Sequence, residues 1–544
     1  MPQGAAGDQN PAVQSGPGPG SAVGGEAPPL ARAAVLGVAA VQAVLLLGTA
    51  GRYGYHRDEL YFLACGRHPA WGYPDQPPLT PFLARLCDAL APGSLVVFRL
   101  PAILAAVAVT VLAAALAREF GGARPAQVLA AVAVGGGTVT LGLGHMLSTS
   151  SVDLLVWVAL TWLVTHILRT GQDRWWVVAG VVAGVGLLNK QLPVVLVAGL
   201  GTGLLVTGQG RTVLRSRWLV LGLCVAAAAW APVLDWQARH GWPQFTLARE
   251  IRAEYGTPGQ RVGFLVLQVL LFSLAATVLW VIGLIRLLRD ERWRSFRALG
   301  WAWLVIQAVF LVTAGQGYYP AGAYPALIAA GAVVVLRRDD VVLPGDAGRE
   351  VAGDAVGPRP GTGGRVGRGP RAGAAWLVGT VAASLVSMPA VLPVLPAHTL
   401  NGSPWTGLAE PLRESVGWPG IAAQIAAVYR SIPPARRAEA VVFTANYGEA
   451  GAVDRYGPAL GLPRAYSGIN GYGYWGPPRR DGGPVVLVWE GGAPEAPFVG
   501  CEDRGRLRTG VHDEESDYAS LYLCDGLAPG GWARAWPELQ HLSS

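Results

Sequence analysis

Charged side chains are scarce in this sequence. Asp, Glu, Lys and Arg make up 14% of its 544 residues, whereas hydrophobic residues make up 52%. Soluble globular domains carry about 25% charged residues, so this composition excludes an ordinary soluble protein. The apolar residues also come in repeated runs, most of them near the length of about 20 residues that crosses a bilayer as a helix. We therefore predict a polytopic membrane protein.

Lysine is almost absent, and the few cysteines show no metal-binding pattern. Lys190 is the single lysine, so the formal net charge of +7 comes from arginine. Most arginines lie between apolar segments, where they anchor and orient helices, so we predict no nucleic-acid binding. No zinc or CxxC spacing occurs among the five cysteines, which are Cys65, Cys87, Cys224, Cys501 and Cys524.

The apolar segments predict the fold class. The first follows a long polar leader, which favours a retained span over a cleaved signal peptide. Backbone polar groups in lipid must be paired internally, and these lengths suit helices better than barrel strands. The prediction is an all-α polytopic membrane bundle of about eleven helices, at residues 30–51, 95–117, 125–147, 152–168, 175–188, 192–207, 218–234, 262–285, 299–313, 318–336 and 374–395.

Arginines concentrate in alternate loops, and this bias predicts the orientation and the domains. Cytoplasmic loops carry the excess of basic residues, which here makes the N-terminus cytoplasmic. Residues 1–29 are predicted to be a disordered cytoplasmic tail because they offer little to bury. We expect a transmembrane catalytic domain at 30–336 with a first outer loop at 52–94, a disordered cytoplasmic linker at 337–373, and a last transmembrane helix at 374–396.

The remaining residues, 397–544, are expected outside the cytoplasm and are numerous enough to form their own core. The stretch "EAVVFTANYGEAGAVDRYG" indicates a strand followed by a helix, and "GPVVLVWEGG" indicates another strand. A small extracytoplasmic α/β domain is therefore predicted. Cys501 and Cys524 lie in it on the oxidising side of the membrane, where they either form a disulfide or remain two buried thiols.

The first outer loop contains an apolar stripe with helical spacing. Arg85 and Asp88 would face water if this helix lay in the membrane interface. An ordinary helix packed on the bundle is the alternative. The stripe consists of Leu79, Phe82, Leu83, Leu86 and Leu90.

The same loop begins with "YHRDELYF", residues 55–62, in which Asp58 and Glu59 stand side by side. Carboxylates also suit the N-terminal end of a helix, so capping is one explanation. Acidic residues at membrane depth are nevertheless costly and usually functional. Other polar groups fall at the same outer ends of the predicted spans, namely Asp75, Gln76, His145, Asp153, Lys190, Tyr318 and Tyr319.

Such a set of side chains suits the transfer of a sugar from a lipid phosphate. A carboxylate beside the reactive carbon takes a proton from an acceptor hydroxyl as general base. Lys190 and the phenols of Tyr318 and Tyr319 would hold the phosphate leaving group and stabilise its developing charge. The apolar bundle would hold the lipid tail. Two carboxylates also suit a glycosidase, but hydrolysis of soluble glycans needs no bundle of eleven helices.

These motifs resemble a known family. The stretches "YHRDELYFLACGRHPAWGYPDQPPLTPFLARL", "SVDLLVWVALTW", "GLLNKQLPVVLV" and "GYYPAGAYPALIAAGA" are similar to the GT-C glycosyltransferases of family 39 and their PMT-like relatives. These relatives include protein O-mannosyltransferases, aminoarabinose transferases and Rgt-type bacterial enzymes. "NYGEAGAVDRYG" and "YSGINGYGYWGPP" resemble actinobacterial members. The resemblance implies a GT-C-like bundle, a polyprenyl-phosphate-linked sugar donor and inversion at the anomeric carbon.

The resemblance also implies roles for individual residues. Asp58 matches the first-loop acidic residue of the family, the base or acceptor-orienting group, and Glu59 completes its acidic pair. Asp153 matches the second-loop aspartate of the same cavity. Asp75 and Gln76 align with an acidic-basic pair that helps hold the lipid phosphate in the aminoarabinose enzymes.

Two departures from that pattern weaken phosphate binding at the first loop. Gln76 replaces a lysine, and Tyr61 replaces an arginine just after the acidic pair. Because of both departures, we expect Lys190, Tyr318 and Tyr319 to make the main contacts with the phosphate. Both departures also argue against an aminoarabinose transferase. Relatives in this superfamily differ in whether they use a divalent cation, so the prediction includes no certain cofactor and leaves the metal open.

The function predicted from the sequence is a plasma-membrane glycosyltransferase with an extracytoplasmic active site. It moves a hexose such as mannose, or a pentose, from a polyprenyl-phosphate carrier in the bilayer to a hydroxyl of a lipid, cell-wall glycan or protein. One alternative is a flippase or transporter for lipid-linked sugars, although such proteins tend to show internal repeats and none is seen here. The other is an inactive relative that acts as an interaction protein.

Overall fold

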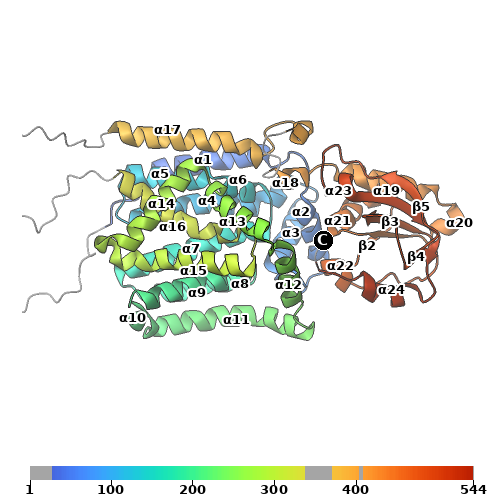
Figure 1. Cartoon of the computed structure of the whole chain (residues 1–544), viewed down its shortest axis with the longest axis horizontal. Coiled ribbons are helices and arrows are strands. Elements are labelled where there is room, and N and C mark those ends of the chain that lie inside the picture. The colour runs from blue at the N-terminus through green and yellow to red at the C-terminus, as the bar shows by residue number, and fades with distance from the viewer. Residues whose placement is uncertain (1–26, 337–369, 403–408, 543–544) are drawn as a thin grey trace, which may run out of the picture.

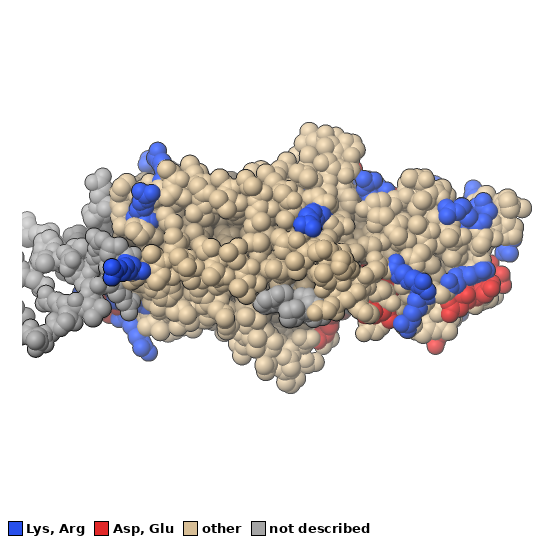
Figure 2. Space-filling model, turned by 90° about the horizontal axis from the view of Figure 1, so that it is seen from above, with Lys and Arg blue, Asp and Glu red and all other residues tan. Residues whose placement is uncertain are grey.

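The computed structural model describes residues 27–336, 370–402 and 409–542. Most of the predicted cytoplasmic tail and linker lies outside these ranges. Two parts are visible in Figure 1: a bundle of helices lying side by side, and at one end of it a region that contains the strands. The flank of the bundle seen in Figure 2 carries few charged side chains, whereas charges gather on the strand-containing region and at the far end of the bundle. This distribution is expected of a membrane protein.

Helices occur at all eleven predicted spans. Seven helices of the described residues are long and apolar enough to cross a membrane, and nine spans result if each of two bent pairs counts as one. The two other predicted spans are the shorter apolar helices α8 and α9. The bundle consists of α1 (Arg32–Thr49), α4 (Leu95–Glu119), α5 (Arg124–Gly135), α6 (Thr138–His145), α7 (Thr149–Thr170), α8 (Trp175–Leu187), α9 (Pro193–Val206), α10 (Gly210–Leu214), α11 (Arg217–Arg239), α12 (Pro243–Tyr255), α13 (Pro258–Leu270), α14 (Leu274–Arg289), η1 (Glu291–Phe296), α15 (Arg297–Thr313), η2 (Tyr319–Ala323), α16 (Tyr324–Leu336) and α17 (Pro370–Ser387).

The two bent pairs meet at their breaks. The axis turns by 56° between α5 and α6 and by 94° between α13 and α14. At the first break, the backbone N–H of Thr138 donates to the carbonyl of Phe272 at 2.8 Å, and that of Val139 donates to Leu271 at 2.8 Å. The Thr138 hydroxyl lies 2.8 Å from the carbonyl oxygens of Leu270 and Leu271. Backbone groups freed by one break are thus satisfied by the other, as burial within lipid requires.

Small residues let neighbouring helices approach closely. A side chain at Gly283 of α14 would lie 1.9 Å from the carbonyl oxygen of Leu327 in α16, and one at Gly331 of α16 would lie 1.9 Å from that of Leu279. Only glycine fits at both positions. Association of helices in a membrane depends on such close packing, because lipid tails are as apolar as the side chains.

The first outer loop forms two helices, α2 (Arg57–Arg67) and α3 (Leu79–Leu90). A capping box starts α2: the His56 side chain accepts from the helix backbone, and Glu59 accepts from the backbone N–H of His56 at 2.9 Å. Along α3, Phe82, Leu86 and Leu90 are 59%, 43% and 71% exposed. This exposed apolar row is what the interfacial helix predicted from the sequence requires.

The C-terminal region contains a five-stranded sheet in the order β2-β1-β3-β6-β5. Strands β2, β1 and β3 are parallel, β6 is antiparallel to β3, and β5 is antiparallel to β6. Its elements are η4 (Met388–Ala390), η5 (Ala397–Gly402), α18 (Glu410–Arg413), α19 (Trp418–Ser431), α20 (Pro434–Arg437), β1 (Val441–Thr444), α21 (Tyr447–Tyr456), η6 (Gly457–Leu460), β2 (Ala465–Tyr466), α22 (Asn470–Tyr474), β3 (Val485–Glu490), β4 (Phe498–Val499), β5 (Glu502–Arg506), α23 (Glu514–Tyr518), β6 (Ala519–Cys524), β7 (Gly526–Leu527) and α24 (Gly531–Leu539).

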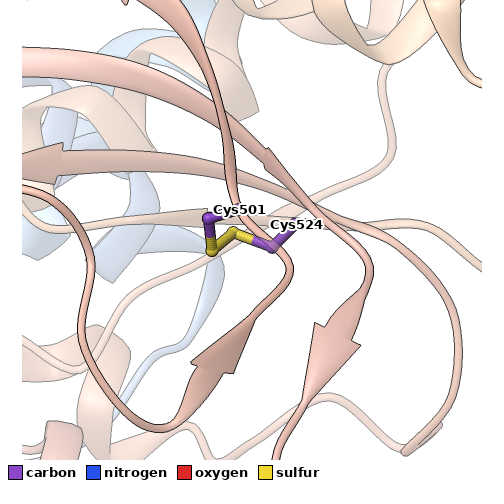
Figure 3. The surroundings of a disulfide bond; sticks show 2 residues. All are labelled: Cys501 and Cys524. Atoms are coloured by element: carbon purple, nitrogen blue, oxygen red, sulfur yellow. A yellow bond between two sulfur atoms is a disulfide. The ribbon is translucent and has the colours of Figure 1, made fainter.

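Two contacts fix this region. A disulfide joins Cys501, just before β5, to Cys524 at the end of β6 (Figure 3). Helix α21 packs on α2 of the first outer loop, where a side chain at Gly451 would come within 2.8 Å of Leu60. The C-terminal region is therefore seated directly on the helix that carries the acidic pair.

Candidate active site

Asp58 lies in the first turn of α2, where the C-terminal region meets the bundle. Its side chain is 35% exposed. The Tyr447 hydroxyl, from the first residue of α21, donates to Asp58 Oδ1 at 2.8 Å. One carboxylate oxygen is thus held by a phenol, while part of the group stays open to an incoming molecule.

A second carboxylate, Asp75, is held next to it by Tyr61. The Tyr61 hydroxyl donates to Asp75 Oδ1 at 2.8 Å and accepts from the backbone N–H of Gly471 at 2.9 Å. Burial raises the pKa of Asp75 to about 7, against the opposite effect of the Tyr61 hydrogen bond, and the nearby charge of Asp58 raises it further. Asp75 therefore has a pKa close to neutral pH. Tyr61, which bonds both Asp75 and Gly471, connects the first outer loop to α22.

An ionic network anchors the C-terminal region at the start of α2. His56 Nε2 lies 2.8 Å from Glu414, and Arg57 contacts both Glu414, at 3.4 Å, and Glu514, at 2.6 Å. Burial alone would lower the pKa of His56, but the Glu414 carboxylate raises it above its ordinary value. Burial alone would raise the pKa of Glu414, but His56 and Arg57 lower it. Because Nδ1 of His56 accepts from the backbone N–H of Asp58, Nε2 carries the ring proton and donates to Glu414. These contacts hold the two residues that precede Asp58.

Glu59 faces the protein interior, away from Asp58. It is fully buried and accepts from Arg99 of α4, itself fully buried, at 2.9 Å and 2.7 Å. Glu59 Oε1 also accepts from the backbone N–H of Leu147 at 2.9 Å, and Arg99 reaches His145 at 3.1 Å. Glu59 and His145 therefore join α2 and α4 to the end of α6 and the residues that follow it.

Lys190 lies in the turn between α8 and α9. Its Nζ donates to Ser150 Oγ at 2.9 Å and lies 4.6 Å from the ring centre of Tyr319 and 5.6 Å from that of Tyr318. Within the part of the chain that the structure describes, it forms no ion pair. Its positive charge is therefore available to an anion.

Asp153 of α7 lines the same small cavity as Lys190. It is 5% exposed, and its Oδ1 has no hydrogen-bond partner among the described residues. Asp153 and Lys190 line one small cavity together with Ser150, Tyr318 and Tyr319. Buried polar atoms normally have a hydrogen-bond partner. The Asp153 oxygen can therefore accept a hydrogen bond from a donor group of a ligand in this cavity.

The structure arranges the predicted residues in two groups. Asp58, Tyr61 and Asp75 form the first, because Tyr447 donates to Asp58 and packs on the Tyr61 ring, while Tyr61 donates to Asp75. Asp153, Lys190, Tyr318 and Tyr319 form the second, around one small cavity. Gln76 is different: it is buried, and its amide points at the Cys65 sulfur at 3.9 Å.

Several residues of the site were not singled out from the sequence. Tyr447 and the Gly471 amide come from the C-terminal region, 389 and 410 residues from their partners in the first outer loop. Both lie in stretches quoted for their family resemblance, "NYGEAG" and "GINGYG", which was the only available signal. No sequence pattern predicted that Arg99 would pair with Glu59, because a single arginine in an apolar helix does not identify its partner.

In the described ranges, no three or more His, Cys, Asp or Glu side chains are grouped so that they could hold a metal ion. The carboxylates Asp58 and Asp75 are instead each bonded to a tyrosine.

A family match and two similar folds relate the chain to known proteins. Residues 75–236 match the family of dolichyl-phosphate-mannose-protein mannosyltransferases, a range that begins after Asp58. ArnT from Cupriavidus metallidurans bound to undecaprenyl phosphate superposes with a TM-score of 0.57 at 15% identity, covering 91% of this chain and 98% of ArnT. Its apo state gives a TM-score of 0.54 at 16% identity, with 90% and 97% covered.

More distant similarity extends to the archaeal oligosaccharyltransferase AglB from Archaeoglobus fulgidus, in complex with an inhibitory peptide and a dolichol-phosphate. That superposition has a TM-score of 0.42 at 15% identity and covers 78% of this chain and 63% of AglB. No functionally curated protein matches the sequence. The family match and the ArnT-like architecture show that this chain is a multi-pass membrane protein with the GT-C fold, related to the GT-C glycosyltransferases.

Proposed function

We propose that the protein transfers a sugar from a polyprenyl-phosphate carrier to a hydroxyl group of a lipid, a cell-wall glycan or a protein, with inversion at the anomeric carbon. The observation that carries the proposal is the presence of a half-open carboxylate, Asp58, together with a cation, Lys190, that forms no ion pair among the described residues. A base and an anion site are what an inverting transfer from a phosphate leaving group requires.

Asp58 acts as the general base. Its exposed part faces the acceptor, while the Tyr447 hydrogen bond at 2.8 Å fixes the carboxylate. The acceptor oxygen attacks the anomeric carbon as its proton passes to Asp58, and the bond from that carbon to the phosphate oxygen breaks. One charge is neutralised at Asp58 while another develops on the leaving phosphate.

Lys190, Tyr318 and Tyr319 hold that phosphate. An ammonium group with two phenol rings beside it supplies one positive charge and two hydroxyl donors, which suits a monophosphate. Their preorganised dipoles stabilise the charge that develops on the leaving group. Asp153 shapes the opposite wall of the cavity.

The lipid tail has a place next to this phosphate position. A largely apolar groove of about 650 Å³ is lined by α13, by α15 and by the turn that ends at Tyr318. Phe310 lines the groove and packs edge-on against Tyr319, with ring centres 5.7 Å apart. A polyprenyl chain in this groove would bring its phosphate to the two tyrosines.

The arginine distribution supports an orientation with the N-terminus in the cytoplasm. The site and residues 397–544, which we treat as an extracytoplasmic α/β domain, then lie outside the plasma membrane. The Cys501–Cys524 disulfide fits that location, because disulfides form and persist outside the reducing cytosol.

Replacing Asp58 by Asn tests the proposal. Removal of a general base typically costs 10²–10⁴-fold in rate, so Asp58→Asn should lower transfer at least about 100-fold in proteoliposomes supplied with radiolabelled polyprenyl-phosphate sugars and a membrane extract as acceptor. Folding should be unchanged. Undiminished transfer would refute the role of Asp58, and movement of the labelled lipid across the bilayer without transfer would indicate a flippase.

Asp88→Asn is the matched control. Asp88 lies in the same outer loop, in α3, and among the described residues its carboxylate accepts a single long hydrogen bond, 3.4 Å from the backbone N–H of Gly93. The control removes one outer-loop charge without touching the site, and its transfer rate should equal that of the wild type.

A further inference from the structure

A separate cleft, of about 510 Å³, lies on the C-terminal region. Three segments form its walls: residues 438–441 at the start of β1, residues 463–466 around β2, and residues 475–480 after α22. The last of these belongs to the "GYGYWGPP" stretch, whose aromatic residues have no role in the mechanism above.

The cleft is basic. Arg464, Arg479 and Arg480 line it, are exposed, and form no ion pair within the described residues. The Arg464 guanidinium lies over the Tyr466 ring, 4.4 Å from its centre, and Arg480 donates to the carbonyl of Ala438 at 3.1 Å. Glu439 is the single carboxylate in the lining. Unpaired guanidinium groups are suited to bidentate binding of carboxylate or phosphate groups.

One end of the cleft reaches the first outer loop. Trp475 lines the cleft and stacks on His68, with ring centres 4.0 Å apart and ring planes at 16°. His68 is the C-cap of α2, the helix whose first turn carries Asp58. A chain bound along the cleft would therefore be directed toward the C-terminal end of that helix, about 15 Å along its axis from Asp58.

We infer that this cleft binds an anionic glycan, a chain of sugars bearing carboxylate or phosphate groups, and that such a glycan is the acceptor. The second half of the inference rests on the proposed transferase function. The three arginines pair with acidic substituents on the sugars, and Trp475, held by its stack on His68, lines the cleft beside them. A cleft of about 510 Å³ is larger than a single free phosphate requires, and it lies on the sheet-containing region, not on the flank of the bundle.

Direct binding tests the inference without catalysis. We would titrate the full-length protein in nanodiscs of neutral lipid with hexagalacturonate and with the neutral maltohexaose, following calorimetric heat or tryptophan fluorescence. Hexagalacturonate should bind more tightly than maltohexaose and more weakly as salt increases. The triple variant Arg464→Gln, Arg479→Gln, Arg480→Gln should weaken its binding at least about tenfold, which corresponds to about 1.4 kcal/mol.

A matched triple variant, Arg506→Gln, Arg508→Gln, Arg534→Gln, removes the same charge from exposed positions outside the cleft lining and should bind like the wild type. Equal binding by the two triple variants, equal affinity for both oligosaccharides, or binding only to vesicles of anionic phospholipid would each overturn the inference.

The Asp58→Asn variant separates this inference from the proposed function. It should lose transfer but bind hexagalacturonate like the wild type. Absence of glycan binding in a protein whose transfer still depends on Asp58 would overturn the cleft assignment and leave the transferase function standing.

Discussion

The two neighbouring carboxylates of α2 lie in opposite environments. Asp58 is partly open and bonded to Tyr447, whereas Glu59 is fully buried against Arg99. Adjacent helix positions point about 100° apart, so one turn of helix presents one acid to the site and the other to the bundle. We propose that Asp58 is the reactive group of the pair and Glu59 the structural one, so substitution of Asp58 should reduce activity and substitution of Glu59 should reduce stability.

Glu59 should matter for stability. Removing one partner of a buried ion pair leaves the other charge uncompensated and costs about 3–5 kcal/mol, so Glu59→Gln should lower the free energy of unfolding by an amount in that range. Chemical denaturation in detergent would measure it for Glu59→Gln, Arg99→Met and the double variant. The double variant should lose less than the sum of the single variants, and strictly additive losses would contradict a coupled pair.

At the scale of elements, the apolar runs were sufficient to locate the helices but not to describe their breaks. All eleven predicted spans contain helix. The run Gly135–Gly137 indicates a weak point between α5 and α6. At the second break, Ser273 caps α14, and a capping serine marks the start of a helix but does not predict a 94° bend. That bend depends on the Thr138 hydroxyl and backbone from another span, and a single segment does not reveal its tertiary partner.

Helix α3 yields a prediction at the same scale. Its exposed row of Phe82, Leu86 and Leu90 should touch lipid if the helix lies in the membrane interface. A fluorophore attached at Leu86→Cys should therefore be quenched by spin-labelled lipids more strongly than one attached at Asp88→Cys. Equal quenching at the two positions would show that α3 does not present this face to the bilayer.

At the scale of the whole molecule, the C-terminal region completes the site that the bundle begins. Tyr447 and Gly471 reach into the first outer loop, and Glu414 and Glu514 hold His56 and Arg57. The sequence predicts that the polar bundle residues gather, because each lies at the same end of a predicted span. The sequence did not predict that the C-terminal region contacts these residues. Contacts between residues about 400 positions apart leave no periodic pattern in the sequence.

The account depends on one pocket shared by the acidic and the phosphate-binding side chains. Cryo-electron microscopy of the protein with a polyprenyl phosphate bound would test this most directly. The phosphate density should lie within about 3 Å of Lys190 Nζ and beside Tyr318 and Tyr319, with the lipid chain along α13 and α15 and Asp58 facing the same space. A phosphate bound elsewhere, or an Asp58 carboxylate turned away from it, would contradict the account.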